Sequence, residues 1–375
     1  MTVEIHGFCD PRFERLKAAF GANFEADLEL GASVAATWRG EPVVDLWAGW
    51  ADVAKTRAWD RDTMVPVAST TKMMVTLCLL MLVDRGRIDL DAPIATYWPD
   101  FAAGGKERVI VRDLFTHQAG APGFSPPVSA SIFLDWEASA ARIAAEPHWF
   151  KGERRVIYHA STYGLIAGEL IRRLSGRAPA QFFREEVAAP AGLDFHFGLA
   201  EVPEPGRVAQ LRLPAAQPPG PPPEGLLARL LGSVLPAEGV RPPETLNPSG
   251  NGVTTARAIS RGCAIFAGAG VLDGTRYLSS ALVDEAYREQ AYGECPYLGP
   301  FRVGLGFGLD GRGFNYPSAD GYGWGGAGGS SGWMDTRLGY SFGYAPNNFG
   351  GLPHLDDRNE RLKGALRAVV ADLSS

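Results

Sequence analysis

Residues that alternate between apolar and polar occur near both ends of the chain, where they predict β-strands. The strand-like segments are residues 32–40, 41–52, 332–337 and 339–347. The first two adjoin at Arg39-Gly40, and the last two are expected to form an antiparallel hairpin. Because strands occur at both ends and helices between them, we expect the first and last segments of the chain to share one sheet.

Helical spacing, with apolar residues three and four positions apart, dominates the rest of the sequence. The predicted helices are residues 11–30, 129–146, 161–176, 179–193, 254–270 and 358–373. A further helix is expected from Ser69 to near Arg85-Gly86, and its nearly continuous apolar stretch Met73–Val83 indicates that it is buried. The Pro-rich segment Gln217–Gly225 fits neither pattern and is expected to be an irregular surface loop, with a lid over a site as the alternative. Together these elements predict a mixed α/β protein that forms one unit over residues 1–375.

The composition limits the kinds of partner and cofactor. With 375 residues, of which 46% are hydrophobic, the chain can bury a sizeable core, and its net charge of -6 gives no reason to expect nucleic acid or a membrane as partner. The N-terminus lacks a signal-peptide pattern, and the apolar stretch is shorter than the about 20 residues of a membrane helix, so we expect a cytoplasmic protein. The cysteines and histidines are scattered without metal-ligand spacing, so we expect no disulfide framework, metal or other cofactor, and Cys78 is expected to be a small core residue.

Ser69 and Lys72 are the first candidates for chemistry. Residues three apart on a helix lie on one face, so the hydroxyl and the amine would be neighbours. A serine hydroxyl needs a base to become a nucleophile, and burial can lower a lysine pKa from about 10.4 far enough for that role. The helix N-terminus would also favour negative charge on the serine oxygen. The alternative is that Ser69 only caps the helix and that Lys72 extends to solvent.

Two further segments supply candidates. Tyr158 precedes a predicted helix start at Ser161 or Thr162, so we expect it in a loop where it can exchange protons with Ser69 and a leaving group; the alternative is an ordinary half-buried tyrosine. The glycine-rich segment 322–333 lets the backbone approach a ligand closely, so that one of its N–H groups can stabilise an oxyanion. The alternative for that segment is a flexible turn.

These motifs together resemble a known superfamily. The chain carries, in this order, Ser69-Thr-Thr-Lys72, Tyr158-His-Ala160 and Trp324-Gly-Gly326. The combination resembles the serine β-lactamases and penicillin-binding proteins, and it is most similar to their class C-like esterase branch, the family VIII carboxylesterases. The resemblance runs from about residue 10 to the C-terminus. It implies a β-lactamase-like fold, with an α/β subdomain from about 1–68 and 250–375 and a mainly helical subdomain of about 69–249.

The resemblance also implies a function, that of a serine carboxylesterase that hydrolyses small uncharged esters through an acyl-enzyme. Ser69 would be acylated, Lys72 would activate it and Tyr158 would share the proton transfer. The backbone N–H groups of Ser69 and Ala327 would form the oxyanion hole. The implied substrate-binding residues are Trp324, Gly325, Gly326 and Phe124, and Trp149 and Trp333 are further aromatic candidates; each of these aromatic side chains has a place in the core as its alternative. His117 would have a structural role.

Two departures from the pattern concern the substrate. Ala160 stands where class C β-lactamases have asparagine, and Trp324-Gly-Gly stands where they have Lys-Thr-Gly. The first change removes an amide that can bind a substrate side chain, and the second replaces a cation that can bind a carboxylate with an apolar indole. Both changes favour an uncharged ester over an anionic antibiotic.

Other functions remain open at this stage. An acyltransferase would use the same acyl-enzyme, and β-lactam or D-amino-peptide hydrolysis could be a side activity. A protein of another class, a non-catalytic binding protein, could share the fold. Ser330 lies in Gly-x-Ser-x-Gly, the nucleophile elbow of α/β-hydrolases, but that elbow needs a helix after the serine, and here we predict a strand.

Overall fold

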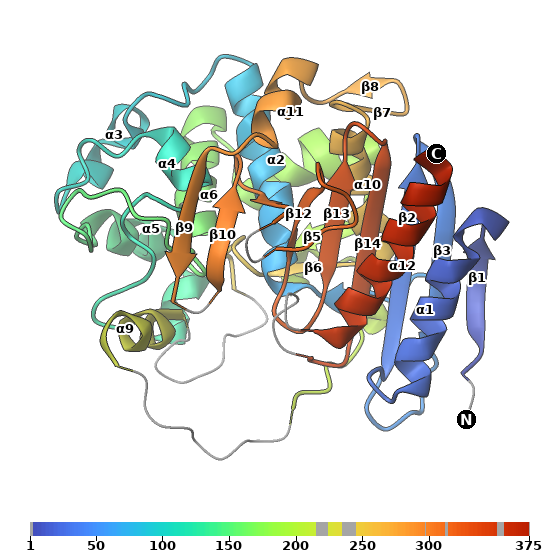
Figure 1. Cartoon of the computed structure of the whole chain (residues 1–375). Helices are drawn as coiled ribbons and strands as arrows, with labels where there is room; N and C mark the ends of the chain where they lie inside the picture. Colours follow the sequence, from blue (N-terminus) through green and yellow to red (C-terminus); the bar gives the residue numbers. More distant parts are fainter. Residues whose placement is uncertain are drawn as a thin grey trace.

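A nine-stranded antiparallel sheet is the largest one within the ranges that the computed structural model describes, which are residues 3–214, 224–234, 245–296, 298–311, 314–350 and 356–374 (Figure 1). In spatial order its strands are β1 (Ile5–Cys9), β3 (Glu41–Gly49), β2 (Gly31–Trp38), β14 (Tyr340–Pro346), β13 (Ser331–Asp335), β12 (Tyr322–Gly325), β11 (Gly308–Leu309), β10 (Gly299–Val303) and β9 (Ala291–Cys295). The predicted strands and hairpin at the two ends of the chain are present.

Strand β14 joins the two ends of the chain. It pairs with β2 on one side, where Gly343 lies opposite Ala35, and with β13 on the other, where Gly343 lies opposite Gly332. The prediction that the first and last segments share one sheet is therefore confirmed.

Helices α1 (Glu14–Glu25) and α12 (Asp357–Ser374) pack side by side on one face of this sheet (Figure 1). Their apolar side chains form a core with the sheet that includes Phe20, Phe342 and Leu366. The predicted helix over residues 11–30 is shorter in the structure, because residues Pro11–Phe13 form a 3₁₀ turn capped by Asp10 and the helix ends at Glu25.

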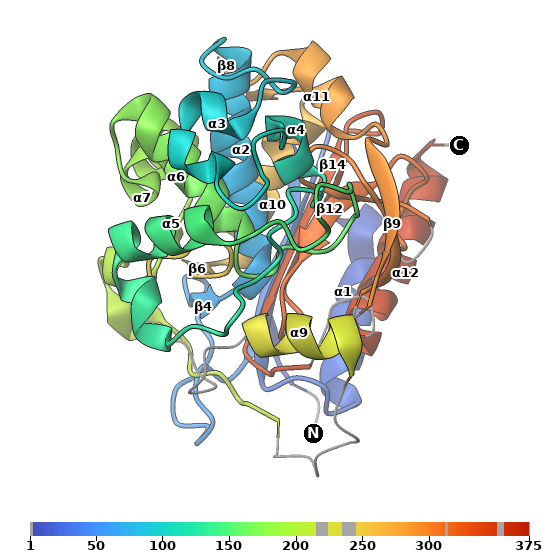
Figure 2. The same cartoon turned by 90° about the vertical axis from the view of Figure 1, so that its left-hand side faces the viewer.

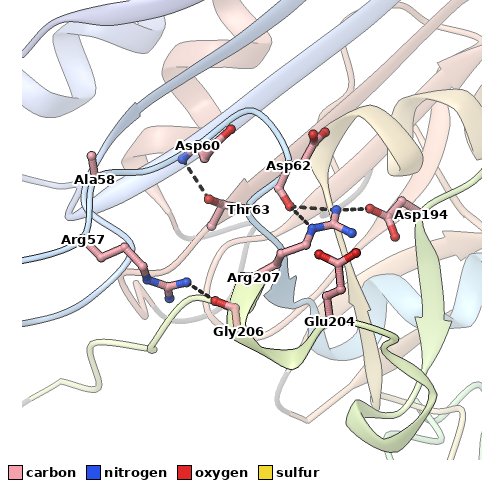
Figure 3. A pocket seen from close by; sticks show the side chains of 9 residues that line it. All are labelled: Arg57, Ala58, Asp60, Asp62, Thr63, Asp194, Glu204, Gly206 and Arg207. Carbon is pink, nitrogen blue, oxygen red and sulfur yellow. Dashed lines mark hydrogen bonds and ion pairs between the residues drawn. The ribbon is translucent and has the colours of Figure 1, made fainter.

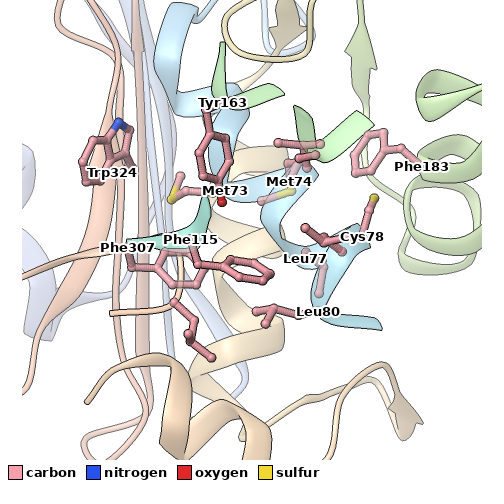
Figure 4. Close-up of a cluster of buried hydrophobic side chains, with 14 of the residues drawn as sticks. Met73, Met74, Leu77, Cys78, Leu80, Phe115, Tyr163, Phe183, Phe307 and Trp324 are labelled. Carbon is pink, nitrogen blue, oxygen red and sulfur yellow. The ribbon is translucent and has the colours of Figure 1, made fainter. Parts of the chain in front are cut away.

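The opposite face is covered by α10 (Ala256–Ala267), which lies against β14, β2 and β13. Gly343 permits this close approach, because a Cβ there would lie 2.2 Å from the Ala256 carbonyl oxygen. Beside α10 runs α2 (Thr71–Asp84), which is buried from Thr71 to Leu82, as its nearly continuous apolar stretch after Lys72 predicts. Figure 4 shows its side chains, including the buried Cys78, packed among aromatic rings from other segments.

The remaining elements lie mainly between β3 and β12 in sequence. The helices are α3 (Ile94–Tyr97), α4 (Val111–Phe115), α5 (Trp136–Ala145), α6 (Tyr163–Ser175), α7 (Pro179–Phe183), α8 (Ala189–Ala191), α9 (Gly225–Val234) and α11 (Ser280–Ala286). The short strands are β4 (Val65–Pro66), β5 (Phe195–Phe197), β6 (Gly252–Thr254), β7 (Val271–Leu272) and β8 (Thr275–Arg276). Figure 2 shows α5, α6 and α7 gathered on the side of α2 away from α1 and α12.

Two predicted helices are interrupted. Residues 129–146 form a 3₁₀ turn and then α5, because the Asp135 side chain accepts the N–H of Ala138 and caps a new helix start. Residues 179–193 form α7, a π-helical turn over Arg184–Ala188 and α8. Most of the Pro-rich segment, through residue 223, lies outside the described residues, and Gly225 begins α9. The proposed division at about residues 68 and 250 stays a prediction.

Candidate active site

Ser69 lies in a 3₁₀ turn, Ala68–Thr70, directly before α2. The predicted helix therefore begins two residues later than expected, at Thr71. The cause is Ala68, whose φ of 43° is in the left-handed region that a side chain disfavours. The Thr71 hydroxyl holds this strained residue by donating to the Ala68 carbonyl at 2.5 Å. Ser69 itself is partly exposed, as a nucleophile must be.

The Lys72 side chain is buried, with 1% of its surface exposed, and its amine lies next to the Ser69 hydroxyl. Its Nζ donates to Ser69 Oγ at 3.2 Å, to the Ala160 carbonyl at 2.9 Å and to the Ser249 carbonyl at 2.7 Å. The two carbonyls fix the amine in place without supplying a negative charge. The expected proximity of the hydroxyl and the amine is observed.

Ser249 and Asn247 hold the second of these carbonyls, and sequence analysis did not identify them. The Ser249 hydroxyl donates to the Ser161 carbonyl at 2.9 Å and accepts the Gly164 N–H at 2.6 Å, while Asn247 Nδ2 also donates to the Ser161 carbonyl, at 2.7 Å. These bonds tie the segment after residue 244 to the start of α6. Lys72 contacts the backbone oxygen of Ser249. Every residue has a backbone oxygen, so no residue type in the sequence indicates this contact.

Tyr158 lies in the loop before α6, as expected, and its ring is next to Lys72. The Lys72 Nζ is 4.9 Å from the centre of the Tyr158 ring. Thr162 does not cap α6, because it donates its hydroxyl to the Ala121 carbonyl at 2.7 Å, and the Gly164 N–H in the first turn is bound by the Ser249 hydroxyl.

Trp324, in the inner strand β12, contacts Tyr158 through the one polar atom of its side chain. The indole Nε1–H donates to Tyr158 Oη at 3.2 Å, and the two rings lie 5.3 Å apart. The interpretation of this indole as a purely apolar substitute for a cation was therefore incomplete. Trp324 still supplies a hydrogen-bond donor, but one without charge.

His117 packs edge-on against Tyr158, with ring centres 4.9 Å apart, and it also contacts Trp324. Its Nδ1 accepts the backbone N–H of His159 at 3.1 Å. Complete burial, together with the nearby His159 and Lys72, lowers the pKa of His117 well below its ordinary value, so the ring is neutral. A neutral, buried ring that supports Tyr158 agrees with the structural role expected for it.

Two backbone N–H groups, those of Ser69 and Ala327, are candidates for the oxyanion hole. Among the described residues, neither the Ser69 N–H nor the Ala327 N–H donates to a protein oxygen. Gly326 brings them together, since a Cβ at that position would lie 3.1 Å from the Ser69 nitrogen and 2.1 Å from the Val67 oxygen. Two converging donors without acceptors are the arrangement that an oxyanion requires.

Ser330 braces this arrangement and is already bonded. Its hydroxyl donates to the Val67 carbonyl at 2.8 Å, lies 2.9 Å from the Thr70 hydroxyl, and is followed by strand β13. The structure therefore lacks the strand–turn–helix context of a nucleophile elbow at Ser330.

Phe124, Trp333 and Trp149 have different surroundings. Phe124 is 1% exposed, packed against Phe133 and beneath the Arg142 guanidinium, and its part in substrate binding stays a prediction. Trp333 stacks on Phe342 in the core beneath α1 and α12. Trp149 lies under the Arg229 guanidinium of α9, 3.6 Å from the ring centre. Of the glycines, Gly325 is partly exposed at the end of β12.

A separate open groove of about 610 Å³ is polar and contains none of these candidates (Figure 3). Its arginines are engaged, Arg57 with the Gly206 carbonyl and Arg207 with Asp194 and the Asp62 carbonyl. Across the described residues, no group of three His, Cys, Asp or Glu side chains is placed to hold a metal ion. Nor does any described helix combine the length and apolar character needed to cross a membrane.

Comparisons with known proteins identify the family of this chain. The family model described as Beta-lactamase matches residues 20–367. The chain is 34% identical over 361 residues to "Esterase/beta-lactamase LipL" of Mycobacterium tuberculosis, a match that covers 92% of this chain and 83% of that protein.

Two solved structures are similar over nearly the whole chain. One is a penicillin-binding protein homolog from Caulobacter crescentus, with a TM-score of 0.89, 36% identity and coverage of 98% of this chain and 100% of that one. The other is a family VIII carboxylesterase, with a TM-score of 0.88, 34% identity and the same two coverages. The fold is therefore β-lactamase-like, as the motifs implied, and this chain belongs to the Beta-lactamase family.

Proposed function

We propose that this protein is a serine carboxylesterase that hydrolyses small, uncharged esters through an acyl-enzyme on Ser69. Its relatives support an ester-cleaving serine hydrolase, since LipL is named an esterase and the similar solved structure is a family VIII carboxylesterase. The observation that carries the choice of residues is the environment of Lys72, whose amine contacts the Ser69 hydroxyl and two buried carbonyls.

Those contacts suit a neutral amine acting as a base. A neutral lysine has two N–H groups and one lone pair. If the N–H groups donate to the Ala160 and Ser249 carbonyls, the lone pair points at Ser69 Oγ and can accept its proton. When the proton arrives, all three N–H groups of the ammonium have acceptors, so proton transfer requires no rearrangement of the site.

The acylation step follows from this geometry. Ser69 Oγ forms a bond to the ester carbonyl carbon as its proton passes to Lys72, and the carbonyl electrons move to oxygen, which accepts hydrogen bonds from the N–H groups of Ser69 and Ala327. When the carbonyl re-forms, the bond to the alcohol oxygen breaks. Tyr158, next to Lys72, passes its hydroxyl proton to that oxygen and takes up the proton that Lys72 received from Ser69. Water then repeats the sequence in reverse and releases the acid.

The neutrality of Trp324 supports an uncharged substrate. Its N–H donates to Tyr158 Oη, so this position offers a carboxylate no positive charge. Ala160 supplies only a backbone carbonyl to the site. A carboxylate that is desolvated without a partner costs several kcal/mol.

Labelling tests the nucleophile directly. A fluorophosphonate probe followed by peptide mapping should modify Ser69 in the wild-type protein and nothing in Ser69→Ala, which should fold with an unchanged melting temperature and have no esterase activity. Ser330→Ala should still be labelled at Ser69. Comparable ester turnover by folded Ser69→Ala would refute the proposal.

A second candidate is β-lactam hydrolysis, which the name of LipL favours because it includes both activities. A side-by-side measurement of kcat/KM on p-nitrophenyl butyrate and on a chromogenic cephalosporin decides between them. We expect the ester to be preferred by at least about a hundredfold, which corresponds to about 2.7 kcal/mol. Equal values would favour the β-lactamase.

A further inference from the structure

The backbone that follows β12 makes a tight turn whose second residue is Ala327. The Gly329 N–H donates to the Gly326 carbonyl at 3.1 Å, which closes a four-residue turn. Gly328, the third residue, has a φ of 99°, the value that a type II turn demands and glycine provides. The N–H of the second residue takes no part in such a turn, so the Ala327 N–H is left to point outward. We call residues Gly326–Gly329 the oxyanion turn.

The carbonyls of this turn point to the other side, into the start of α12. Arg358 Nη2 donates to the Gly328 carbonyl at 3.0 Å, and Asn359 Nδ2 donates to the Gly329 carbonyl at 2.8 Å. Asn359 is itself fixed, because its Oδ1 accepts the Ser331 hydroxyl at 2.7 Å. Two consecutive side chains of one helix thus bind two consecutive carbonyls of the turn.

The Arg358 side chain is held by a buried ionic cluster, which we define as Glu29, Asp356 and Arg358. Only 2% of Arg358 is exposed. Its guanidinium contacts Asp356 Oδ2 at 2.5 Å and Glu29 Oε2 at 3.2 Å, and it donates to the Asn348 carbonyl at 2.8 Å. Tyr344 donates its hydroxyl to Glu29. The fork of the guanidinium therefore has one orientation.

The fit around this cluster leaves no room for adjustment of the turn. A Cβ at Gly329 would lie 2.4 Å from Arg358 Nη2 and 2.7 Å from Asp356 Oδ2. The desolvation cost of a buried ionic cluster commonly cancels most of its attraction, so such a cluster contributes little to stability by itself. What it supplies is a fixed geometry.

We propose that Arg358 and Asn359 are positioning residues, which hold the Gly328 and Gly329 carbonyls so that the Ala327 N–H converges with the Ser69 N–H on the oxyanion. This inference rests on the proposed function in that it assigns the oxyanion hole to these two N–H groups. Neither side chain touches the substrate. Their effect passes through the turn, whose Ala327 N–H would otherwise rotate with the peptide plane.

The proposal predicts a loss of transition-state binding without a loss of substrate binding. A donor displaced by about 1 Å costs up to about a hundredfold in rate. Arg358→Met should lower kcat for p-nitrophenyl butyrate about ten- to hundredfold and leave KM within about twofold. It should also lower the ratio of kcat for the ester to kcat for the matched thionoester. The negative charge that develops on the thionoester lies on sulfur, which is stabilised less by N–H donors.

Asn359→Asp is a second variant that preserves the shape of the side chain. Its carboxylate oxygen faces the Gly329 carbonyl instead of an N–H and repels it, so the same pattern in kcat and in the thionoester ratio is expected. This variant keeps the proposal testable if Arg358→Met does not fold.

Arg361→Met is the matched control. Arg361 lies on the same helix, and its guanidinium donates to Asn23 Oδ1 of α1 at 2.5 Å, away from the oxyanion turn. Its loss should lower the melting temperature while kcat and the thionoester ratio remain unchanged.

Hydrogen exchange supplies a readout that is independent of activity. The Gly326 N–H donates to the Ser330 carbonyl at 2.8 Å and the Gly329 N–H to the Gly326 carbonyl at 3.1 Å, and both should exchange faster in Arg358→Met and Asn359→Asp than in Arg361→Met. If the wild-type protein cleaves no ester and does not react with the fluorophosphonate, the proposed function is refuted. Hydrogen exchange in the variants would still show whether Arg358 and Asn359 hold the turn. Variants with unchanged exchange, or with the kcat and thionoester ratio of the wild type, would overturn the inference.

Discussion

At the scale of single residues, the site combines side chains that the sequence predicted with backbone groups that it did not predict. The spacing of Ser69 and Lys72 predicted their contact, and the 3.2 Å between Nζ and Oγ confirms it. The carbonyls of Ala160 and Ser249 complete the environment of the amine, yet they come from residues 88 and 177 positions away. Such partners follow from the fold and not from any local pattern.

The hydrogen bond of Trp324 was also missed, although the residue type itself indicates a donor. Indole has one N–H donor, and a buried indole usually finds an acceptor for it. The prediction considered only the loss of a positive charge at this position and left out the indole N–H. The acceptor proved to be the hydroxyl of Tyr158.

This contact leads to a prediction for Trp324→Phe, which keeps an aromatic ring but removes the donor. A hydrogen bond of this kind contributes about 0.5–1.5 kcal/mol. We therefore expect kcat for p-nitrophenyl butyrate to fall about two- to tenfold, with a small change in melting temperature. Steady-state kinetics over a range of pH would measure the effect.

Trp333→Phe is the control for that experiment. Trp333 also occupies the sheet, but it stacks on Phe342 on the face covered by α1 and α12. Its replacement should cost stability and leave kcat unchanged. If the two variants lose kcat equally, the Tyr158 contact is not the cause.

At the scale of elements, the sequence predicted which segments form strands and helices better than where they begin and end. The predicted helix at Ser69 begins at Thr71, after a 3₁₀ turn whose first residue, Ala68, adopts a left-handed conformation. The helix predicted over residues 129–146 breaks at Asp135, a capping residue whose position inside an amphipathic pattern was overlooked. Boundaries depend on single side-chain bonds, whereas periodicity averages over many residues.

The contact of α10 with β14 gives a prediction at this scale. Gly343→Ala would place a Cβ 2.2 Å from the Ala256 oxygen and 2.7 Å from the Ser260 nitrogen, so the helix must move off the sheet. We expect a loss of about 1–3 kcal/mol in the free energy of unfolding. Chemical denaturation would measure it.

Gly364→Ala is the opposite case. Gly364 lies within α12, and a Cβ there would meet nothing within 4 Å. Alanine is favoured over glycine inside a helix by about 0.8–1.0 kcal/mol, so this variant should be more stable than the wild type. A Gly343→Ala protein as stable as Gly364→Ala would contradict the close packing of α10.

At the scale of the whole molecule, the buried ionic cluster links the first and last thirds of the chain. Burial, helped by the negative charge of Asp356, raises the pKa of Glu29 to about 8, despite the attraction of Arg358 and Arg212. The unfolded chain releases this proton near the ordinary value of about 4.3. Between these two values the folded protein holds one proton more than the unfolded chain, so Glu29 makes stability fall as pH rises from about 4.3 to 8.

Glu29→Gln should remove this contribution, because glutamine does not ionise. The free energy of unfolding, measured by denaturation at intervals between pH 5 and 8, should decline with pH more steeply in the wild type than in Glu29→Gln. Glu294 is exposed, so the free energy of unfolding of Glu294→Gln should decline with pH as steeply as that of the wild type. Parallel curves for wild type and Glu29→Gln would show that Glu29 keeps an ordinary pKa.

The position of β14 determines when this enzyme can first be assembled on the ribosome. The strands β2 and β3 emerge early, but the neighbour that β2 needs is made of residues 340–346, close to the end of the chain. Domains generally fold as units during synthesis, and pairing across such long separations is slow. The helix that carries Lys72 is therefore not covered by the finished sheet until residues 340–346 have been synthesised. A chain released before residue 340 would carry Ser69, Lys72 and Tyr158 and still lack the strand that closes the sheet around them.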